Sequence, residues 1–434
     1  MEGRYIDNPY LQSTINNIDK QSLLNEELQS LFSSSLNEID QQLKDNQPTI
    51  NKDNTIYTGS LGLCFSYLMR YLIPTSSGNQ QPTTYLDLCR DLYNCLTRDY
   101  QKKRSSKKRI TFLSGDNGLL TIGIILNSLD RDNDKMLMLF KQLLNQLNEI
   151  INDDDDDDDE QEYPYELLYG KSGYLQCLLL IKRYCLKNSL ESLQLLETLD
   201  QSIEALVVEI VESGRDYAID DESESPLMYE WHRSQYLGGV HGLAGILYML
   251  MSSLEMISIN QEKKRSIDSD IRESLDYLVS TMLPSGNFPT RTDSDSDRLV
   301  QFCHGAPGII PTLVKAYSYF NNDPKYLECA KYSSNVIWKY GLLTKGTGLC
   351  HGISGNTFSF LLIYKESNDL CFLYKAIAFV KLSTTKSFFK QLNIPDNPFS
   401  LFEGLGGLAW LLNDILNIYK YDKDYLKLIN FPSF

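Results

Sequence analysis

Three histidine–glycine strings recur along the chain, and two of them also carry a cysteine. The strings are QFCHGAPGI at 301–309, GLCHGISGN at 348–356 and GGVHGLAGI at 238–246. In each string a histidine stands directly before a Gly-x-x-Gly pattern, so three of the four histidines occupy equivalent positions. Cysteine and histidine are residue types that bind zinc, and histidine also transfers protons near neutral pH. The strings therefore mark candidate metal and acid–base positions.

Two cysteines and one histidine in these strings form a candidate metal-binding set. Cys303 and Cys350 stand two residues before their Gly-x-x-Gly patterns, and His351 follows Cys350. Two thiolates and an imidazole make a three-ligand zinc set that leaves the fourth position for water or a substrate. Thiolates favour zinc over magnesium or calcium. We therefore predict one Zn²⁺ ion on these residues; the alternative is two core cysteines that happen to sit at turns.

The remaining histidines are candidates for proton transfer beside such a metal. An open position on zinc could hold a substrate thiol as its thiolate near neutral pH. Addition of that sulfur to an electrophilic carbon then needs a proton donor for the carbanion or enolate. His241 and His304 stand directly before their own Gly-x-x-Gly patterns and suit this role. The alternative is that each is a structural imidazole at a turn, as we expect for His232.

Seven Gly-x-x-Gly patterns define the elements that must position these residues. They begin at residues 59, 115, 170, 242, 305, 352 and 404, with start-to-start spacings of 47 to 72 residues. Each pattern opens a segment that is apolar around most of a helix, as expected for helices buried on several sides. More amphipathic helices are expected between them, and the clearest is at 266–283.

This repeat predicts an all-α fold of seven helical hairpins, each with one buried and one half-exposed helix. Such units could form an open solenoid or close into a ring, an α/α toroid. Burial of the inner helices on all sides favours the ring. In a ring the seven turns meet at one end, so that residues distant in the sequence converge there. We expect the whole chain, 1–434, to form this single domain.

Composition and charge narrow the class of protein. The chain has 434 residues, of which 42% are hydrophobic, and can bury a large core. It contains no uncharged run of 18 apolar residues and begins without signal-peptide features, so we expect a cytoplasmic protein without a membrane span. Nine cysteines, an odd number, are expected to be reduced thiols. A net charge of −16 argues against nucleic-acid binding.

Two charged runs stand apart from the repeat. Residues 153–162 carry nine acidic residues, without which the net charge falls from −16 to −7. We expect an acidic disordered insertion at 152–162, with a binding segment for a basic partner as the alternative. The basic run at 102–109 is expected to be a solvated loop. Its alternatives are a patch for peripheral plasma-membrane contact and a nuclear localisation signal.

Several segments together resemble the eukaryotic LanC-like (lanthionine synthetase C-like) proteins. They are EWHRSQYLGGVHGLAGILY (230–248), SGNFP (285–289), FCHGAPG (302–308), GTGLCHGISGN (346–356) and NPFSLFEGLGGLAWLL (397–412), together with Arg4 and NPY (8–10). The resemblance runs from the N-terminus to the last repeat and excludes the acidic insertion. It implies an α/α barrel of seven helical hairpins, with zinc held at one mouth by Cys303, Cys350 and His351.

The resemblance also implies a reaction and further site residues. Bacterial LanC enzymes cyclise peptides by adding a zinc-activated cysteine thiol to dehydroalanine or dehydrobutyrine, whereas eukaryotic relatives are associated with adding glutathione to such residues. The family pattern assigns acid–base work to His241. It places Glu166 where bacterial cyclases carry a catalytic aspartate. Arg4 and Lys345 match basic positions that suit the carboxylates of glutathione.

Two positions depart from the family pattern. Bacterial cyclases have an arginine where this chain has Leu299, next to Arg298, and some relatives have an arginine where it has Asn393. The predicted function is a zinc-dependent, glutathione transferase-like enzyme whose partners are glutathione and proteins that contain dehydroamino acids. The alternatives are a non-catalytic glutathione-binding zinc adaptor or sensor, and a peptide lanthionine cyclase.

Overall fold

The computed structural model describes residues 3–12, 19–46, 54–73, 83–100, 110–151, 163–185, 191–421, 426–427, 429 and 431. The acidic insertion at 152–162 and the basic run at 102–109 lie outside the described residues, so both interpretations stay predictions. The described part of the chain is built from helices, and its β-type pairing is limited to four isolated bridges. Among these helices, none combines the length and the apolar character needed to cross a membrane.

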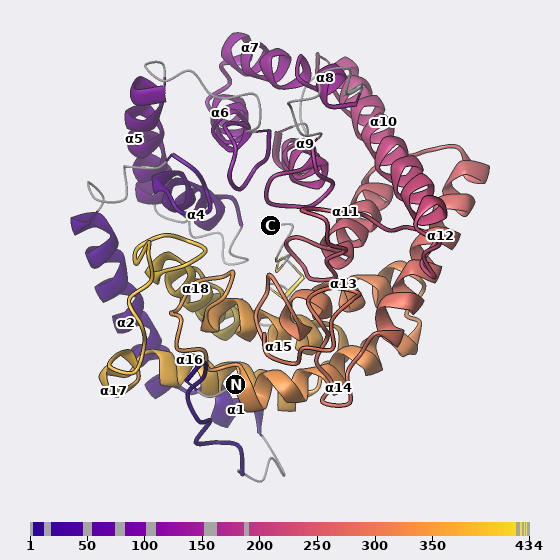
Figure 1. Ribbon diagram of the computed structural model, residues 1–434. Helices are drawn as coiled ribbons and strands as arrows, with labels where there is room; N and C mark the ends of the chain where they lie inside the picture. The colour runs from indigo at the N-terminus through magenta and orange to yellow at the C-terminus, as the bar shows by residue number, and fades with distance from the viewer. Residues whose placement is uncertain are drawn as a thin grey trace.

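Seven helices of the described chain form an inner ring, and each begins within one of the Gly-x-x-Gly patterns. They are α4 (Ser60–Leu72), α6 (Asn117–Leu129), α9 (Lys171–Cys185), α11 (Leu243–Met256), α13 (Ala306–Tyr319), α15 (Ile353–Ser367) and α18 (Leu405–Tyr421). Each packs against the next, and α18 packs back against α4, which closes the ring (Figure 1). The structure is therefore the closed, all-α toroid that the repeat favoured.

The outer helices cover this ring and complete the hairpins. Six inner helices pair with a helix that follows them in the chain: α5 (Thr83–Tyr100), α7 (Asn133–Leu144), α10 (Glu191–Asp220), α12 (Gln261–Ser280), α14 (Pro324–Tyr340) and α16 (Leu370–Ser383). The amphipathic helix expected at 266–283 is α12, which begins five residues earlier. Short helices α1 (Lys20–Leu23), α8 (Leu147–Ile151) and α17 (Lys386–Phe389) lie in the connections.

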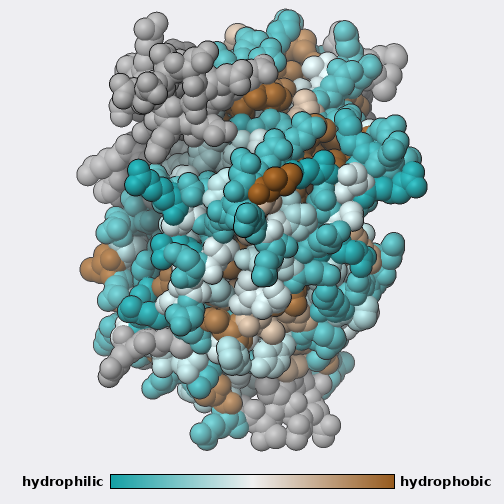
Figure 2. Space-filling view, turned by 45° about the vertical axis from the view of Figure 1, so that its right-hand side comes forward, coloured by the Kyte–Doolittle hydropathy of each residue, from teal (hydrophilic) through white to brown (hydrophobic). Residues whose placement is uncertain are grey.

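The seventh unit is assembled from the two ends of the sequence. Helix α18 pairs with α2 (Glu26–Asp45), which precedes the first inner helix, instead of with a helix that follows it. The tyrosine hydroxyl of Tyr419 in α18 donates a hydrogen bond to the carbonyl of Leu23 (2.7 Å). The seven units expected from the repeat are thus present, and the seventh combines helices from the two ends of the sequence. Figure 2 shows one face of the molecule, on which hydrophilic residues predominate among the coloured residues and apolar ones are scattered.

The second glycine of each pattern explains why the pattern repeats. A Cβ atom on this glycine would lie 1.9 to 2.7 Å from the carbonyl oxygen six residues earlier, at all seven positions. These glycines are Gly62, Gly118, Gly173, Gly245, Gly308, Gly355 and Gly407. Because any larger residue would collide with the backbone, glycine lets each inner helix begin directly against the loop that precedes it.

Backbone hydrogen bonds join the loops that precede the inner helices. The N–H of Cys303 donates to the carbonyl of Cys350 (3.3 Å), and the N–H of Cys350 donates to that of Phe402 (2.8 Å). Phe402 donates in turn to Tyr57 (3.2 Å), and Tyr57 donates to Leu113 (2.9 Å). These five residues occupy the same position in five successive units of the ring. The repeat therefore places the two cysteines next to each other, in adjacent units of the ring.

Candidate metal centre

Cys303, Cys350 and His351 meet where these loops converge. One ligand atom from each residue lies within 4.8 Å of the other two. The cysteines are 6% and 2% exposed, and His351 is half-buried. Two sulfurs and an imidazole nitrogen at this separation are a donor set suited to Zn²⁺, with a fourth tetrahedral position left open. The residues present therefore fit the metal that the sequence predicts.

The two thiols of this cluster differ in acidity. The hydrogen bond from Cys350, followed by that from His351, lowers the pKa of the Cys303 thiol well below its ordinary value, against the effect of burial. Burial and the neighbouring Cys303 sulfur raise the pKa of Cys350. The geometry thus already favours one thiolate, and a bound divalent cation would favour the second because its charge offsets the cost of burial.

Two residues that the sequence analysis did not single out contact these sulfurs. The Nε2 amide of Gln301 donates to Cys303 Sγ over 3.0 Å. Tyr57 forms a hydrogen bond with Cys350, and burial followed by the charges of the two sulfurs raises its pKa. The repeat register could have pointed to Tyr57, which occupies the cysteine position in the first unit. Gln301 has no such signal, because glycine stands at the equivalent position of the other two strings.

His241 and Glu166 form a hydrogen-bonded pair beside the metal centre. Nδ1 of His241 lies 2.7 Å from Oε2 of Glu166. The Glu166 carboxylate is 2% exposed and also accepts the backbone N–H groups of Leu168 (3.1 Å) and Tyr169. These donors fix the carboxylate, which holds a proton on Nδ1 and leaves Nε2 of His241 to exchange a proton with a substrate.

Aromatic rings surround His241. The indole of Trp231 stacks on its imidazole, with centroids 4.7 Å apart and an interplanar angle of 12°. His232 and Arg233 both have positive φ, 49° and 57°, and form the tight turn that follows this tryptophan. Such a conformation is uncommon for residues other than glycine. We infer that this turn holds the indole of Trp231 against His241. His232 is exposed in this turn, outside the metal cluster.

His304 is close both to His241 and to the metal cluster. It follows Cys303 in the chain, and its ring centroid is 5.6 Å from that of His241. Burial lowers the pKa of His304, so its imidazole is neutral at pH 7. Its Nδ1 atom is buried with no hydrogen-bond partner among the described residues. A neutral imidazole in this position can accept a proton from a thiol more readily than it can donate one.

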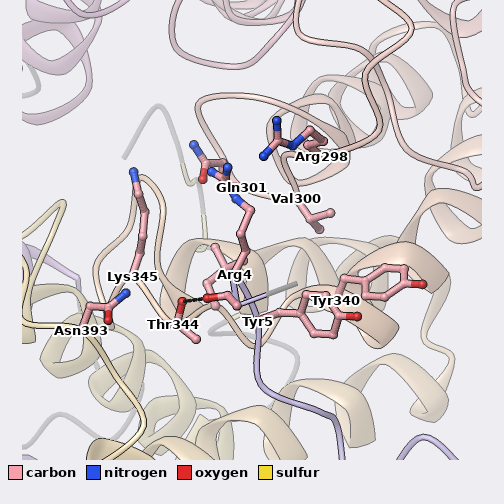
Figure 3. A pocket seen from close by; sticks show the side chains of 11 residues that line it. Arg4, Tyr5, Arg298, Val300, Gln301, Tyr340, Thr344, Lys345 and Asn393 are labelled. Atoms are coloured by element: carbon pink, nitrogen blue, oxygen red, sulfur yellow. Dashed lines mark hydrogen bonds between the residues drawn. The ribbon is translucent and has the colours of Figure 1, made fainter. Parts of the chain in front are cut away.

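Figure 3 shows a pocket of about 190 Å³ that is lined in part by Gln301, the residue that donates to Cys303. Three cationic residues, Arg4, Arg298 and Lys345, line it, and its described lining contains no aspartate or glutamate. The pocket thus brings together the two basic residues that the resemblance pointed to and adds a third. Asn393, one of the two departures from the family pattern, lines the same pocket. Gln301 lines the pocket too, so one side chain contacts both the pocket and Cys303 of the metal centre.

Arg4 reaches this pocket because the N-terminal segment pairs with the loop after α14. The N–H of Ile6 donates to the carbonyl of Leu342 (2.7 Å), and the N–H of Thr344 donates to that of Arg4 (3.0 Å). Tyr5 packs edge-on against Tyr340, with ring centroids 4.7 Å apart. Residues from the N-terminal segment and from the loop after α14 therefore line the pocket together.

Comparisons with known proteins point to one family. A family model described as lanthionine synthetase C-like protein matches residues 51–425. "Glutathione S-transferase LANCL1" of Danio rerio is 32% identical over 427 residues, 96% of each chain. "LanC-like protein GCL1" of Arabidopsis thaliana is 30% identical over 376 residues, 84% of this chain and 79% of the relative. The solved structure of nisin cyclase matches with a TM-score of 0.65 at 16% identity, over 90% of this chain and 98% of its own, and so shows a shared fold.

Proposed function

The chain belongs to the lanthionine synthetase C-like family, and we propose that it adds the thiol of glutathione to dehydroalanine or dehydrobutyrine residues of proteins. The observation that carries this proposal is the gathering of three features at one end of the ring. They are the Cys303–Cys350–His351 cluster, the His241–Glu166 pair and the basic pocket. The name of the Danio rerio relative supports glutathione as the thiol.

Cys303, Cys350 and His351 are the residues that would hold zinc in this proposal. The ion, when bound, would favour the thiolate form of the substrate thiol at its open position. The low exposure of both cysteines limits competition by water for the ligand sulfurs. Donation from Gln301 and Tyr57 to the sulfurs keeps these ligands oriented, as partners of metal ligands commonly do.

The basic pocket would bind the carboxylates of glutathione. Arg4 and Arg298 offer planar guanidinium groups that can pair with a carboxylate through two hydrogen bonds, and Lys345 adds a compact charge. Because Gln301 contacts both the pocket and the metal centre, we expect a ligand anchored in the pocket by its carboxylates to extend its thiol toward the cluster.

The His241–Glu166 pair would complete the addition by proton transfer. The sulfur forms a bond to the β-carbon of the dehydroamino acid, and the electron pair of the double bond moves to the α-carbon. A proton from Nε2 of His241 forms the new C–H bond, and the proton lost by the thiol restores the imidazole through solvent. Glu166 orients the ring and stabilises its positive charge before transfer. The sum is addition of one thiol across one double bond.

Mass spectrometry of a dehydroalanine peptide incubated with glutathione and protein of measured zinc content tests this proposal. We expect a glutathione adduct that forms faster than in the absence of protein and that is lost when zinc is chelated. Glutathione binding without any adduct would instead support a non-catalytic adaptor. A thioether ring in a peptide that carries its own cysteine, formed in preference to the glutathione adduct, would support a cyclase.

A further inference from the structure

We infer that Gln301 is a positioning and specificity-determining residue. The nitrogen of its side-chain amide orients the metal ligand Cys303, and the oxygen of the same amide accepts a hydrogen bond from the ligand in the basic pocket. The inference rests on the proposed function, because it takes Cys303 as a ligand and the pocket as the thiol site. It goes beyond that function in assigning both tasks to a single side chain.

The first observation is the contact with sulfur. Gln301 is only 6% exposed, and its Nε2 donates to Cys303 Sγ at 3.0 Å. Its backbone is fixed as well, because its N–H donates to the carbonyl of His304 and its carbonyl accepts the N–H of His304, both at 3.1 Å. A buried donor held in this way restricts the direction in which Cys303 can present its sulfur lone pairs to a metal.

The second observation is that the same side chain lines the basic pocket. Figure 3 shows the Gln301 amide above the end of Arg4, with Lys345 on one side and Arg298 on the other. An amide that commits its nitrogen to Cys303 has its oxygen left as an acceptor. No hydrogen bond from the described residues to this oxygen is found, so it is available to a ligand N–H.

These two contacts define what the pocket recognises. Three cations attract any ligand with carboxylates, and on their own they distinguish poorly between a thiol peptide and a simple mercapto acid. A neutral acceptor among them adds a requirement for a ligand ammonium or amide N–H, since a site built to hydrogen-bond such a group disfavours analogues that lack it. The ligand class is therefore a thiol with both carboxylate and N–H groups.

Equilibrium measurements on the Gln301→Met variant test the inference without turnover. Methionine has a side chain of similar length but lacks both the amide N–H donor and the amide oxygen acceptor. In the Co²⁺-loaded protein we expect the thiolate-to-cobalt charge-transfer band to shift. Calorimetry with S-methylglutathione, which keeps the carboxylates and N–H groups but has no free thiol, should show binding about fivefold weaker, the change expected for one lost hydrogen bond.

Matched controls separate this role from general damage. Gln391→Met changes an exposed glutamine of the chain and should leave both the cobalt spectrum and the dissociation constant as in the wild type. If Gln301→Met does not fold, Gln301→Asn, whose shorter amide cannot span both contacts, is expected to give the same two changes. The inference is overturned if a folded variant shows an unshifted band, or binding within twofold of the wild type.

These measurements distinguish a failure of this inference from a failure of the proposed reaction. A protein that forms no glutathione adduct but shows both equilibrium changes would contradict the transferase activity and keep the role of Gln301. If the protein forms the adduct but Gln301→Met equals the wild type in both measurements, the transferase activity is supported and the role of Gln301 is contradicted.

Discussion

Cys350 is the residue on which the candidate metal centre depends most directly, because it contacts Cys303 through both its side chain and its backbone carbonyl. We predict that Cys350→Ala loses bound zinc and thiol addition together, since two remaining ligands hold zinc poorly. Cys177→Ala removes an equally buried thiol on α9, outside the cluster, and should retain zinc. Metal content by plasma mass spectrometry decides the matter, and full zinc in Cys350→Ala would refute this ligand assignment.

His241 is assigned to proton transfer and not to metal binding, because it lies beside the cluster without belonging to it. We predict that His241→Ala keeps zinc but slows addition about 10²–10⁴-fold, the range for loss of a positioned acid or base. Glu166→Gln should slow it less, because a neutral amide still orients the ring. His232→Asn, in the exposed turn, should keep the wild-type rate, since asparagine tolerates positive φ. An undiminished rate in His241→Ala would remove it from the mechanism.

The individual site residues differ in how far the sequence could identify them. The cysteines, His351, His241 and His304 are visible because the repeat places them at equivalent positions. Glu166 could be found only through the family resemblance, since one glutamate among many has no spacing of its own. Gln301 and Trp231 could not be assigned, because no spacing marks the side-chain contact of Gln301 with Cys303, or the stacking on His241 of Trp231, which precedes a turn with positive φ.

Among the elements, the start of α13 shows how strictly the loop–helix junction is specified. Glycine inside a helix is ordinarily less stable than alanine by about 1 kcal/mol. At Gly308 the opposite is expected, because an added Cβ would lie 2.1 Å from the carbonyl oxygen of Phe302 and 2.7 Å from the nitrogen of Gly239. We predict that Gly308→Ala lowers the free energy of unfolding by at least about 2 kcal/mol.

Denaturant titration measures this change, with Ser269→Ala on the exposed face of α12 as the control that should stay within about 0.5 kcal/mol of the wild type. Zinc binding provides a second readout, since Phe302 directly precedes Cys303 of the candidate metal centre. Equal stability of Gly308→Ala and the wild type would mean that the loop can move away, and that the glycine is not required by packing.

For the molecule as a whole, the pairing of outer helices with inner helices is the feature that the sequence specifies least. Apolar periodicity predicts which helices are buried, and all seven inner helices follow from it. It carries no information about which amphipathic helix covers which inner one, so the pairing of α18 with α2 could not be foreseen. The pairing is decided by closure itself, since α18 is followed by no outer helix in the described chain and α2 is adjacent once α4 and α18 meet.

Trp410 of α18 lies at this junction, and its behaviour distinguishes a closed ring from an open solenoid. It is 7% exposed, and its indole packs on Phe65 of α4 with ring centroids 5.5 Å apart. In an open array each unit depends only on its sequence neighbours, so a lesion in the last unit leaves the first unit unaffected. In the closed ring, Trp410→Ala should expose backbone amides of both α18 and α4 to hydrogen exchange, at a cost of about 3–5 kcal/mol.

Trp338→Ala is the matched control, because this tryptophan is also 7% exposed but lies on α14 and stacks on Phe379 of α16. Its truncation should increase exchange in α14 and α16, which belong to the fifth and sixth units, whereas α4 belongs to the first. Hydrogen-exchange mass spectrometry under native conditions compares the two variants helix by helix. If Trp410→Ala increases exchange in α18 while α4 stays as protected as in the wild type, the two ends are not coupled. The bond from Phe402 to Tyr57 would then hold the loops together without making the ring one cooperative unit.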